Sequence, residues 1–334
     1  MKNKKELSTA LLEWYYQNAR KLPWRTIGGA HFDSYQVWIS EIMLQQTTVK
    51  TVEGYFQKWI KRFPTLKELA LADEQEVLLY WQGLGYYTRA RKIHECAKVL
   101  LNTYNGQFPR ERKELLKLPG IGPYSASSIL AFAFNQKETV VDGNVIRVLS
   151  RLYGIETAVD KEKIFQLAEE LTDSKHPADY ASAIMDLGAT ICTPQSAKCL
   201  LCPWQKYCIA KEKCIQDKIP VIQKPEKKRF DGYVHLIQNK NKEFFIQKRE
   251  EKGLLNGLYE FPWTKEKTLL FKSNWNETGQ TVSHTFTHFH LTLTLVETTK
   301  NSLPNEKGIF VHPNDFEKYP FSTLMKKVIN KIKN

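Results

Sequence analysis

Two patterns of hydrophobic positions divide the chain into a helical part and a smaller part that contains strands. Between Leu12 and Ile60, and again from Leu66 to Leu101, apolar residues recur every three or four positions, which is the spacing of one helix face. Up to about residue 217, no convincing alternation of apolar and polar residues marks a strand. We therefore expect the first part to consist almost entirely of helices.

The second part of the chain has the patterns of a small α+β fold. The stretches YVHLIQ and EFFIQKR flank the polar turn NKNK, which predicts a β-hairpin, and HLTLTLVE at residues 290–297 alternates as a strand does. LMKKVINKIK at residues 324–333 has the spacing of a basic amphipathic helix. Two prolines and a run of charges precede this part and predict a linker. We thus expect domains at 1–218 and 232–334, joined by a linker at 219–231.

Composition and charge restrict the class of protein. With 334 residues, the chain is long enough for two or three domains. Its 49 Lys and Arg against 36 Asp and Glu give a net charge of +13, and such an excess attracts polyanions such as nucleic acid. The N-terminal segment lacks a long apolar run and a small-residue cleavage site, and no stretch approaches the ~18 apolar residues of a membrane helix. We expect a cytoplasmic protein without a signal peptide, associated with the nucleoid if it is bacterial.

A glycine turn followed by an acidic residue is the first candidate for chemistry. In LPGIGPYS, residues 118–125, Gly120 and Gly122 permit positive φ and close approach of another backbone, and Pro123 suits the first position of a helix. Free amides at a helix N-terminus attract phosphate. After that helix, VDGNVIRVL places Asp142 at the start of the next one. The unit can hold a backbone phosphate and direct a carboxylate at the nucleotide, although a plain turn with Asp142 as an N-cap is the alternative.

Glu41 is the second candidate, because it lies among apolar residues in SYQVWISEIMLQQT. A carboxylate in apolar surroundings tends toward a raised pKa, and a raised pKa favours a proton donor. The alternative is a helix whose exposed face happens to include Glu41. The segment alone leaves both interpretations open.

Four of the six cysteines lie within 17 residues, with gaps of six, two and five between Cys192, Cys199, Cys202 and Cys208. Six cysteines are few for a secreted disulfide framework, so the group favours a metal or cluster site in a reducing compartment. Four thiolates can ligate a [4Fe–4S] cluster or a zinc ion. Zinc sites usually pair two CxxC motifs, and only one occurs here. Cys96 and Cys214 lie outside the pattern and are expected to be ordinary buried thiols.

Several motifs together resemble one family of enzymes. LPGIGPYSA resembles the helix-hairpin-helix of the DNA glycosylase superfamily, and VDGNV resembles its catalytic aspartate segment. SEIMLQQT, GLGYYTRAR at residues 83–91 and LPWR at residues 22–25 are similar to adenine glycosylases of the MutY type. The cysteine spacing matches the cluster loop of endonuclease III and the MutY family. The resemblance implies an all-α helix-hairpin-helix glycosylase domain with a [4Fe–4S] cluster held by the four cysteines, and a small α+β domain after it.

The resemblance also implies which residues contact DNA. Gln46 and Tyr86 would wedge into the duplex where a base has left the stack, a role that suits an amide and an aromatic ring. Ordinary packing beside a glycine turn is the alternative for Tyr86. Trp24 and Arg25 would line the adenine pocket, Trp24 by stacking on the purine and Arg25 by donating to it. The segment TIGGAHFDS at residues 26–34 is longer than is usual in the family.

The implied reaction is cleavage of an N-glycosidic bond. The departing base must be protonated and the oxocarbenium-like sugar stabilised, which two carboxylates of different pKa can do. By resemblance, Glu41 is the acid, while Asp142 stays ionised and faces the sugar of a nucleotide flipped out of the duplex. Asn144 and Tyr124 would support Asp142 and the developing charge. Bifunctional relatives carry a lysine at the position of Tyr124, and a phenol cannot form their Schiff base, so a monofunctional glycosylase is expected.

The second domain resembles the Nudix-like C-terminal domain of the same family through GLLNGLYEFPW at residues 253–263. The glutamate-rich REXXEE helix of a working Nudix hydrolase is missing, so this domain is expected to bind rather than hydrolyse. In the family it reads 8-oxoguanine with a Phe-Ser-His loop, and here the stretch TFTHFH supplies Phe286, Thr287 and His288. Thr287 replaces the serine and keeps its hydroxyl. A hairpin without a ligand role is the alternative.

These inferences lead to one expected function and two alternatives. We expect a monomeric, monofunctional glycosylase that removes adenine mispaired with 8-oxoguanine or guanine in duplex DNA and so initiates base excision repair. The first alternative is a bifunctional glycosylase and lyase similar to endonuclease III. The second is a DNA-binding iron–sulfur protein without catalytic activity.

Overall fold

A computed structural model describes residues 4–25, 27, 33–221, 226–251, 253–303 and 307–333. The chain divides into two compact units. The first contains Met1–Lys67 and Cys96–Lys224, and the second contains Glu68–Glu95 and Pro225–Asn334. The second unit therefore takes in residues 68–95 from the helical part of the sequence, and the limits of the two domains stay predictions. No described helix combines the length and apolar character needed to cross a membrane.

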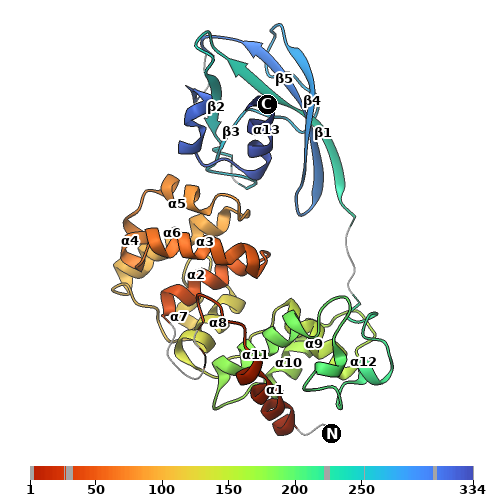
Figure 1. Cartoon of the computed structure of the whole chain (residues 1–334). Helices are drawn as coiled ribbons and strands as arrows, with labels where there is room; N and C mark the ends of the chain where they lie inside the picture. The colour runs from red at the N-terminus through yellow and green to blue at the C-terminus, as the bar shows by residue number, and fades with distance from the viewer. Residues whose placement is uncertain are drawn as a thin grey trace. The chain divides into compact units, whose positions relative to one another are not determined.

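The first unit is helical, as the spacing of apolar residues predicts, and Figure 1 shows its helices. Its longer helices are α1 (Lys4–Asn18), α2 (Ser34–Leu44), α3 (Val49–Arg62), α8 (Pro123–Phe134), α9 (Gly143–Tyr153), α10 (Lys161–Leu171) and α11 (Pro177–Thr190). Its short ones are α7 (Arg112–Leu115), η1 (Cys199–Leu201) and α12 (Ile209–Glu212), and the sequence limits of the two units fall within α4 (Leu66–Leu71) and α6 (Thr88–Thr103). Its described residues contain no strand, only a single bridge between Ala158 and Val221.

Local sequence signals set the helix ends that matter for the site. Helix α2 begins after Asp33, whose side chain accepts a hydrogen bond from the backbone N–H of Tyr35. Helix α8 has Pro123 at its first position and ends at Asn135 in the left-handed conformation. Helix α9 begins after its N-cap residue Asp142, whose side chain accepts a hydrogen bond from the backbone N–H of Val145. These caps fix where the segments between the helices enter and leave the site.

One hydrophobic core joins α1, α9, α10 and α11, which lie together in Figure 1. Leu7 and Leu11 of α1 and Leu149 of α9 have no exposed surface, and Ile184 and Leu187 of α11 pack in the same core. Burying such side chains stabilises a fold by roughly 1.5–3 kcal/mol each. Helix α11 is buried along nearly its whole length, so polar groups on it must find partners inside the protein.

The second unit is built on a single mixed sheet. Its strands are β1 (Lys228–Gln238), β2 (Phe244–Lys248), β3 (Tyr259–Glu260), β4 (Asn276–Thr285), β5 (Phe289–Thr299) and β6 (Gly308–Val311). The sheet order is β3-β2-β1-β5-β4, with β6 paired to β2, and only β1 and β5 run parallel. The predicted hairpin, the strand at 290–297 and the C-terminal helix are all confirmed, the last as α13 (Thr323–Lys333). The first four residues of β1, 228–231, belong to the segment predicted as a linker. They form a strand because Phe230 already packs on the core of the sheet.

Residues 68–95 attach to the sheet-bearing part of the same unit through named hydrogen bonds. The segment contains α5 (Glu74–Trp81) and the glycine turn that follows it. The Gln82 side-chain amide donates to the Phe321 carbonyl oxygen at 3.0 Å. The hydroxyls of Tyr86 and Thr287 lie 2.8 Å apart. Two residues that the sequence associates with DNA therefore meet in this unit although 201 positions separate them.

Candidate active site

A cavity of about 900 Å³ in the first unit brings together the four predicted catalytic residues and three of the predicted DNA-contact residues. Its walls come from the segment before α2, from α2 and the turn to α3, and from α8, α9 and α11. Seven residues singled out in the sequence line it, namely Trp24, Arg25, Glu41, Gln46, Tyr124, Asp142 and Asn144. The two carboxylates therefore share one cavity, although they come from different helices and lie about 100 positions apart in the chain.

Glu41 is buried in α2, with 9% of its surface exposed. Burial raises the pKa of its carboxyl to about 7, and the negative charge of Asp142 acts in the same direction. A hydrogen bond from the Tyr124 hydroxyl to Glu41 Oε2 at 3.1 Å and the charge of Arg25 lower the pKa in part. Burial also raises the pKa of Tyr124 well above its usual value, so its phenol stays a neutral donor. Glu41 can therefore hold a proton near neutral pH.

Asp142 has a different environment at the N-terminus of α9. Its Oδ1 accepts from the backbone N–H of Val145 at 2.8 Å, and its Oδ2 accepts from the side-chain amide of Asn144 at 2.7 Å. Asp142 is thus both the helix N-cap and part of the cavity lining, so the capping role does not exclude a role in the site, which stays a prediction. Tyr124 was expected to support Asp142, but its hydroxyl is bonded to Glu41 instead.

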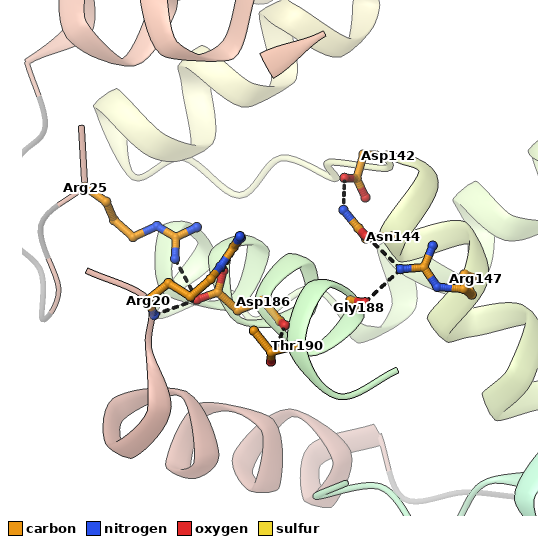
Figure 2. A network of polar contacts seen from close by, with 8 residues as sticks. All are labelled: Arg20, Arg25, Asp142, Asn144, Arg147, Asp186, Gly188 and Thr190. Atoms are coloured by element: carbon orange, nitrogen blue, oxygen red, sulfur yellow. Dashed lines mark hydrogen bonds and ion pairs between the residues drawn. The ribbon is translucent and has the colours of Figure 1, made fainter. Parts of the chain in front are cut away.

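Arg147 orients the amide that holds Asp142, as Figure 2 shows. One guanidinium nitrogen, Nη2, donates to Asn144 Oδ1 at 2.8 Å and to the Gly188 carbonyl at 2.7 Å. Its Nε donates to the Cys192 carbonyl at 2.8 Å. Because Asn144 accepts from Arg147, its NH₂ group must face Asp142. The sequence reasoning missed Arg147, whose only signal is a basic residue three positions after Asn144 on one helix face.

Gly188 allows α11 to approach this network closely. A Cβ atom at this position would lie 2.6 Å from Asn144 Cβ and 3.2 Å from its Cα. We expect Gly188→Ala to push α9 and α11 apart, to lower stability by about 1–3 kcal/mol and to slow any reaction that uses Asp142. Thermal unfolding and a rate measurement check this expectation.

The control for that substitution is another helical glycine. Gly54 in α3 has no heavy atom within 4 Å of an added Cβ, so Gly54→Ala should be neutral or stabilising by up to about 1 kcal/mol. Equal unfolding temperatures for the two alanine variants would contradict the close approach as the cause.

A buried ion cluster forms the wall next to Asn144's network. Asp186 in α11 is fully buried and pairs with Arg20 and Arg25, both of which line the cavity, and Figure 2 shows the three together. The sequence reasoning missed Arg20 and Asp186. Their one signal is an aspartate in an otherwise apolar, small-residue helix, PADYASAIMDLGAT.

The predicted DNA-contact residues of the first unit are placed differently from one another. Gln46 lines the cavity with a positive φ of 60°, while Trp24 is 7% exposed and packs edge-on against Phe56 with ring centroids 5.3 Å apart. Gly120 uses the positive φ that a glycine permits, at 75°, but Gly122 does not, because it is the extended N-cap of α8 with φ −95°. Neither glycine lines the cavity. The long segment 26–34 lies mostly outside the described residues.

The four clustered cysteines gather beside the C-terminal half of α9. Arg151, with 2% of its surface exposed, donates to Cys192 Sγ at 3.4 Å and to the carbonyls of the following loop. Burial and the neighbouring cysteines raise the pKa of the Cys199 and Cys202 thiols, the latter to about 12. Among the described residues, no three His, Cys, Asp or Glu side chains are arranged to hold a single metal ion. A four-iron cluster bonds each thiolate to its own iron, so four thiols within electrostatic reach of one another, beside a buried guanidinium, fit such a group.

The two remaining cysteines have different environments. Cys96 is buried, as expected, but Cys214 is exposed, which corrects the sequence-based expectation. Cys214 follows the short helix α12 with a positive φ of 56°, in the turn that ends that helix.

The predicted recognition loop lies in the second unit, between β4 and β5. Thr287 and His288 are exposed at the tip, and the backbone N–H of Phe286 donates to the Phe289 carbonyl at 2.8 Å, which closes the turn. The rings of Phe286 and Phe289 lie 4.6 Å apart. The tight turn thus exposes the Thr287 and His288 side chains between two phenylalanines whose rings pack together.

Comparisons with known proteins agree with this arrangement. Residues 39–174 match the family described as HhH-GPD superfamily base excision DNA repair protein, and residues 233–331 match the NUDIX domain family. The chain is 37% identical over 303 residues to the adenine DNA glycosylase of Buchnera aphidicola subsp. Acyrthosiphon pisum (strain APS), covering 85% of this chain and 84% of that relative. It is 42% identical over 219 residues to the adenine DNA glycosylase of Homo sapiens, covering 63% of this chain and 40% of the human protein.

Solved structures show the same helical fold. A thermostable thymine-DNA glycosylase is 30% identical, with a TM-score of 0.57, and the match covers 63% of this chain and 97% of that one. Endonuclease III in a non-covalent complex with DNA is 24% identical, with a TM-score of 0.53 and coverage of 65% and 100%. The second likeness bears on the fold alone. Both matches span about two thirds of this chain.

Proposed function

This chain belongs to the adenine DNA glycosylase family, and we propose that it removes adenine mispaired with 8-oxoguanine or guanine from duplex DNA without cutting the strand. It is a base excision repair glycosylase by its relatives. The observation that carries the proposal is the cavity shared by Glu41, whose pKa burial raises to about 7, and Asp142, which accepts two hydrogen bonds.

The proposed reaction uses the two carboxyl groups in sequence. Glu41 gives its proton to a ring nitrogen of the flipped adenine, the bonding pair of the C1′–N9 bond leaves with the base, and positive charge develops on the sugar. The Asp142 carboxylate stabilises that charge at short range in a cavity of low dielectric. Water then adds to C1′ and its proton passes to the Glu41 carboxylate, which restores a neutral sugar and the protonated acid. Tyr124 supports the acid by holding Glu41 Oε2, which leaves Oε1 to carry the proton.

Strand cleavage is the property that separates this proposal from a bifunctional enzyme. Tyr124 occupies the hairpin position at which bifunctional relatives carry a lysine, and its hydroxyl is already bonded to Glu41. Lys50 of α3 also lines the cavity, so another amine is present there. Reduction with borohydride during turnover tests it, because a Schiff base would become a stable protein–DNA adduct. We expect base release without a matching amount of trapped protein–DNA adduct.

A panel of duplexes tests the proposed function directly. Duplexes with A opposite 8-oxoguanine, A opposite C and thymine glycol are incubated with the protein, and base release and strand scission are measured separately. Release from A:8-oxoguanine alone, without scission, supports the proposal. Release from thymine glycol with scission supports an endonuclease III-like enzyme, and no release from any duplex supports a DNA-binding protein without activity.

The positive net charge of the chain supports duplex DNA as the partner. A net charge of +13 favours a polyanion, and affinity should fall steeply with salt as phosphate contacts release counterions. We further propose that the protein acts as a monomer in the cytoplasm. Sedimentation of the free protein and of its duplex complex tests the stoichiometry.

We also propose that Cys192, Cys199, Cys202 and Cys208 hold a [4Fe–4S] cluster. When bound, such a cluster would crosslink the loop after α11 and place a delocalised negative charge beside the Arg151 guanidinium, which donates to Cys192 Sγ. Iron determination on protein purified without oxygen tests this, with Cys202→Ser expected to lose iron. The exposed Cys214 is the matched control, because Cys214→Ser should keep it.

Recognition of the base opposite adenine is proposed for the loop that carries Thr287. Its hydroxyl is exposed and paired with that of Tyr86 at 2.8 Å. We expect Thr287→Ala to narrow the preference for A:8-oxoguanine over A:G by about 2- to 12-fold, because one hydrogen bond to a polar group contributes roughly 0.5–1.5 kcal/mol. The ratio of single-turnover rates on the two duplexes measures it.

The control for that variant is a hydroxyl on strand β4, which leads into the loop. Ser283 is exposed in β4 and pairs with Thr292 across the sheet, so Ser283→Ala should leave the ratio unchanged. An unchanged ratio in Thr287→Ala as well would count against the recognition loop.

A further inference from the structure

Asp186 is bonded more completely than its charge alone requires. Its Oδ1 accepts from Arg20 Nε at 2.8 Å and Nη2 at 2.6 Å, and its Oδ2 accepts from Arg20 N at 3.0 Å and Arg25 Nη1 at 2.7 Å. Arg20 by itself supplies one positive charge and three donors, which would compensate one buried carboxylate. The bond to Arg25 is additional, so its consequence should be sought at Arg25.

Arg25 and Glu41 line the same cavity. The charge of Arg25 reaches Glu41, since it lowers the pKa of that carboxyl, yet among the described residues no ion pair or hydrogen bond joins the two side chains. A guanidinium free to turn would form a bidentate pair with a nearby carboxylate, which is the geometry Arg prefers. Such a pair would favour ionised Glu41 and remove the proton that the reaction needs. The other charged or titratable groups around the two residues are Tyr15, Arg20, Lys50, Tyr124 and Asp142.

We propose that Asp186 is a positioning residue that holds Arg25 against α11 and so keeps its guanidinium from pairing with the Glu41 carboxyl. The site then has a cation on its wall for an electron-rich purine while its acid stays protonated. This role rests on the proposed function, in which Glu41 delivers a proton to the base. The side chains of Asp186 and Arg25 are 0% and 9% exposed, so solvent does little to weaken the restraint.

The test is the pH dependence of adenine release in the variant Asp186→Asn. Single-turnover rate constants on an A:8-oxoguanine duplex are measured from pH 5 to 9 with enzyme in excess, so that the rate constant reports folded molecules only. We expect the alkaline limb of the profile to move to lower pH by about 1–3 units, the effect of an opposite charge within reach of a carboxylate. At pH 7.5 this shift appears as a fall in rate of about tenfold or more.

Two further variants assign that shift to Arg25. In Asp186→Asn combined with Arg25→Gln, the released cation is gone, and the limb should return to its original pH or above it. In Arg20→Gln, Asp186 keeps Arg25, so the limb should stay in place even if thermal stability falls. A rate that drops by one factor at every pH in Asp186→Asn would overturn the proposal, because a purely structural residue gives that result.

The remaining outcomes also decide the question. If Asp186→Asn does not fold, Asp186→Glu keeps the charge but displaces Arg25 by one methylene, and a limb moved in the same direction supports the proposal while an unmoved limb overturns it. If the unmodified protein releases no adenine from any duplex, the proposed function fails. If it releases adenine and the Asp186 variants keep the original limb, only the positioning role fails.

Discussion

Replacement of Asp142 by Asn is expected to abolish adenine release while leaving duplex binding largely intact. Asparagine keeps an oxygen that can accept from the Val145 N–H, so the N-cap of α9 persists. It removes the negative charge that would stabilise the oxocarbenium-like sugar inside the cavity, and losing a single preorganised group of this kind costs about 10²–10³-fold in rate. Single-turnover release from an A:8-oxoguanine duplex and fluorescence anisotropy of the same duplex measure the two effects.

A second aspartate N-cap separates this loss from damage to a helix end. Asp160 caps α10, where its Oδ1 accepts from the N–H groups of Glu162 and Lys163 at an exposed site outside the cavity. Asp160→Asn should therefore change neither release nor binding. A loss of duplex binding in Asp142→Asn that is as large as the loss of release would show that the residue acts through structure.

The residues that could be predicted from the sequence are those whose signals are local. Glu41 stands out because it interrupts an apolar stretch. Asp142 stands out because it begins the helix that follows the glycine turn and α8. The structure places both in the lining of one cavity, to which Tyr124 of α8 also contributes. Two of these helices, α2 and α8, pack directly against each other, which is why positions so far apart in the chain can meet.

The residues that were missed act through partners far away in the chain. Arg20 and Asp186 are separated by 166 positions, and no periodicity or spacing links them. Arg147 stabilises the site by donating to carbonyls of α11 and of the cysteine loop, and such acceptors leave no mark in a sequence. Only the buried aspartate could have been suspected, since a carboxylate within an apolar helix needs a cation close by.

The second unit gives the same lesson at a larger scale. Alternation predicts β1 and β5 as strands, but their parallel pairing depends on the chain path between them. The contact between Tyr86 and Thr287 likewise follows from residues 68–95 joining this unit. The segments around Tyr86 and Thr287 each contain a recognisable motif, but neither motif indicates that the two segments are in contact.

Replacement of Glu41 by Gln is expected to lower adenine release by about 10²–10⁴-fold, the usual contribution of a general acid. The unmodified protein should release adenine at a constant rate below pH 7 and lose activity above it, because the pKa of Glu41 lies at about 7 and only the protonated form can donate. The variant should show no such limb. Single-turnover rates across pH measure both effects, and a limb that persists near pH 7 in Glu41→Gln would assign the titration to another group.

Glu41→Gln should lower activity but raise the stability of the fold at alkaline pH, because the pKa of Glu41 is raised in the folded state. The folded-state pKa of Glu41 lies above its usual value of 4.5, so its contribution to stability is full below pH 4.5 and is lost as pH rises through 7. At pH 8 the buried carboxylate then costs about 3 kcal/mol, and Glu41→Gln should unfold at a higher temperature than the unmodified protein there, but not at pH 4. Glu260 is the control, since it is a buried glutamate paired with Arg249 at 3.0 Å. Its Glu260→Gln variant should lose stability at pH 8, because the largely buried Arg249 guanidinium loses its buried ionic partner and keeps the exposed Glu251.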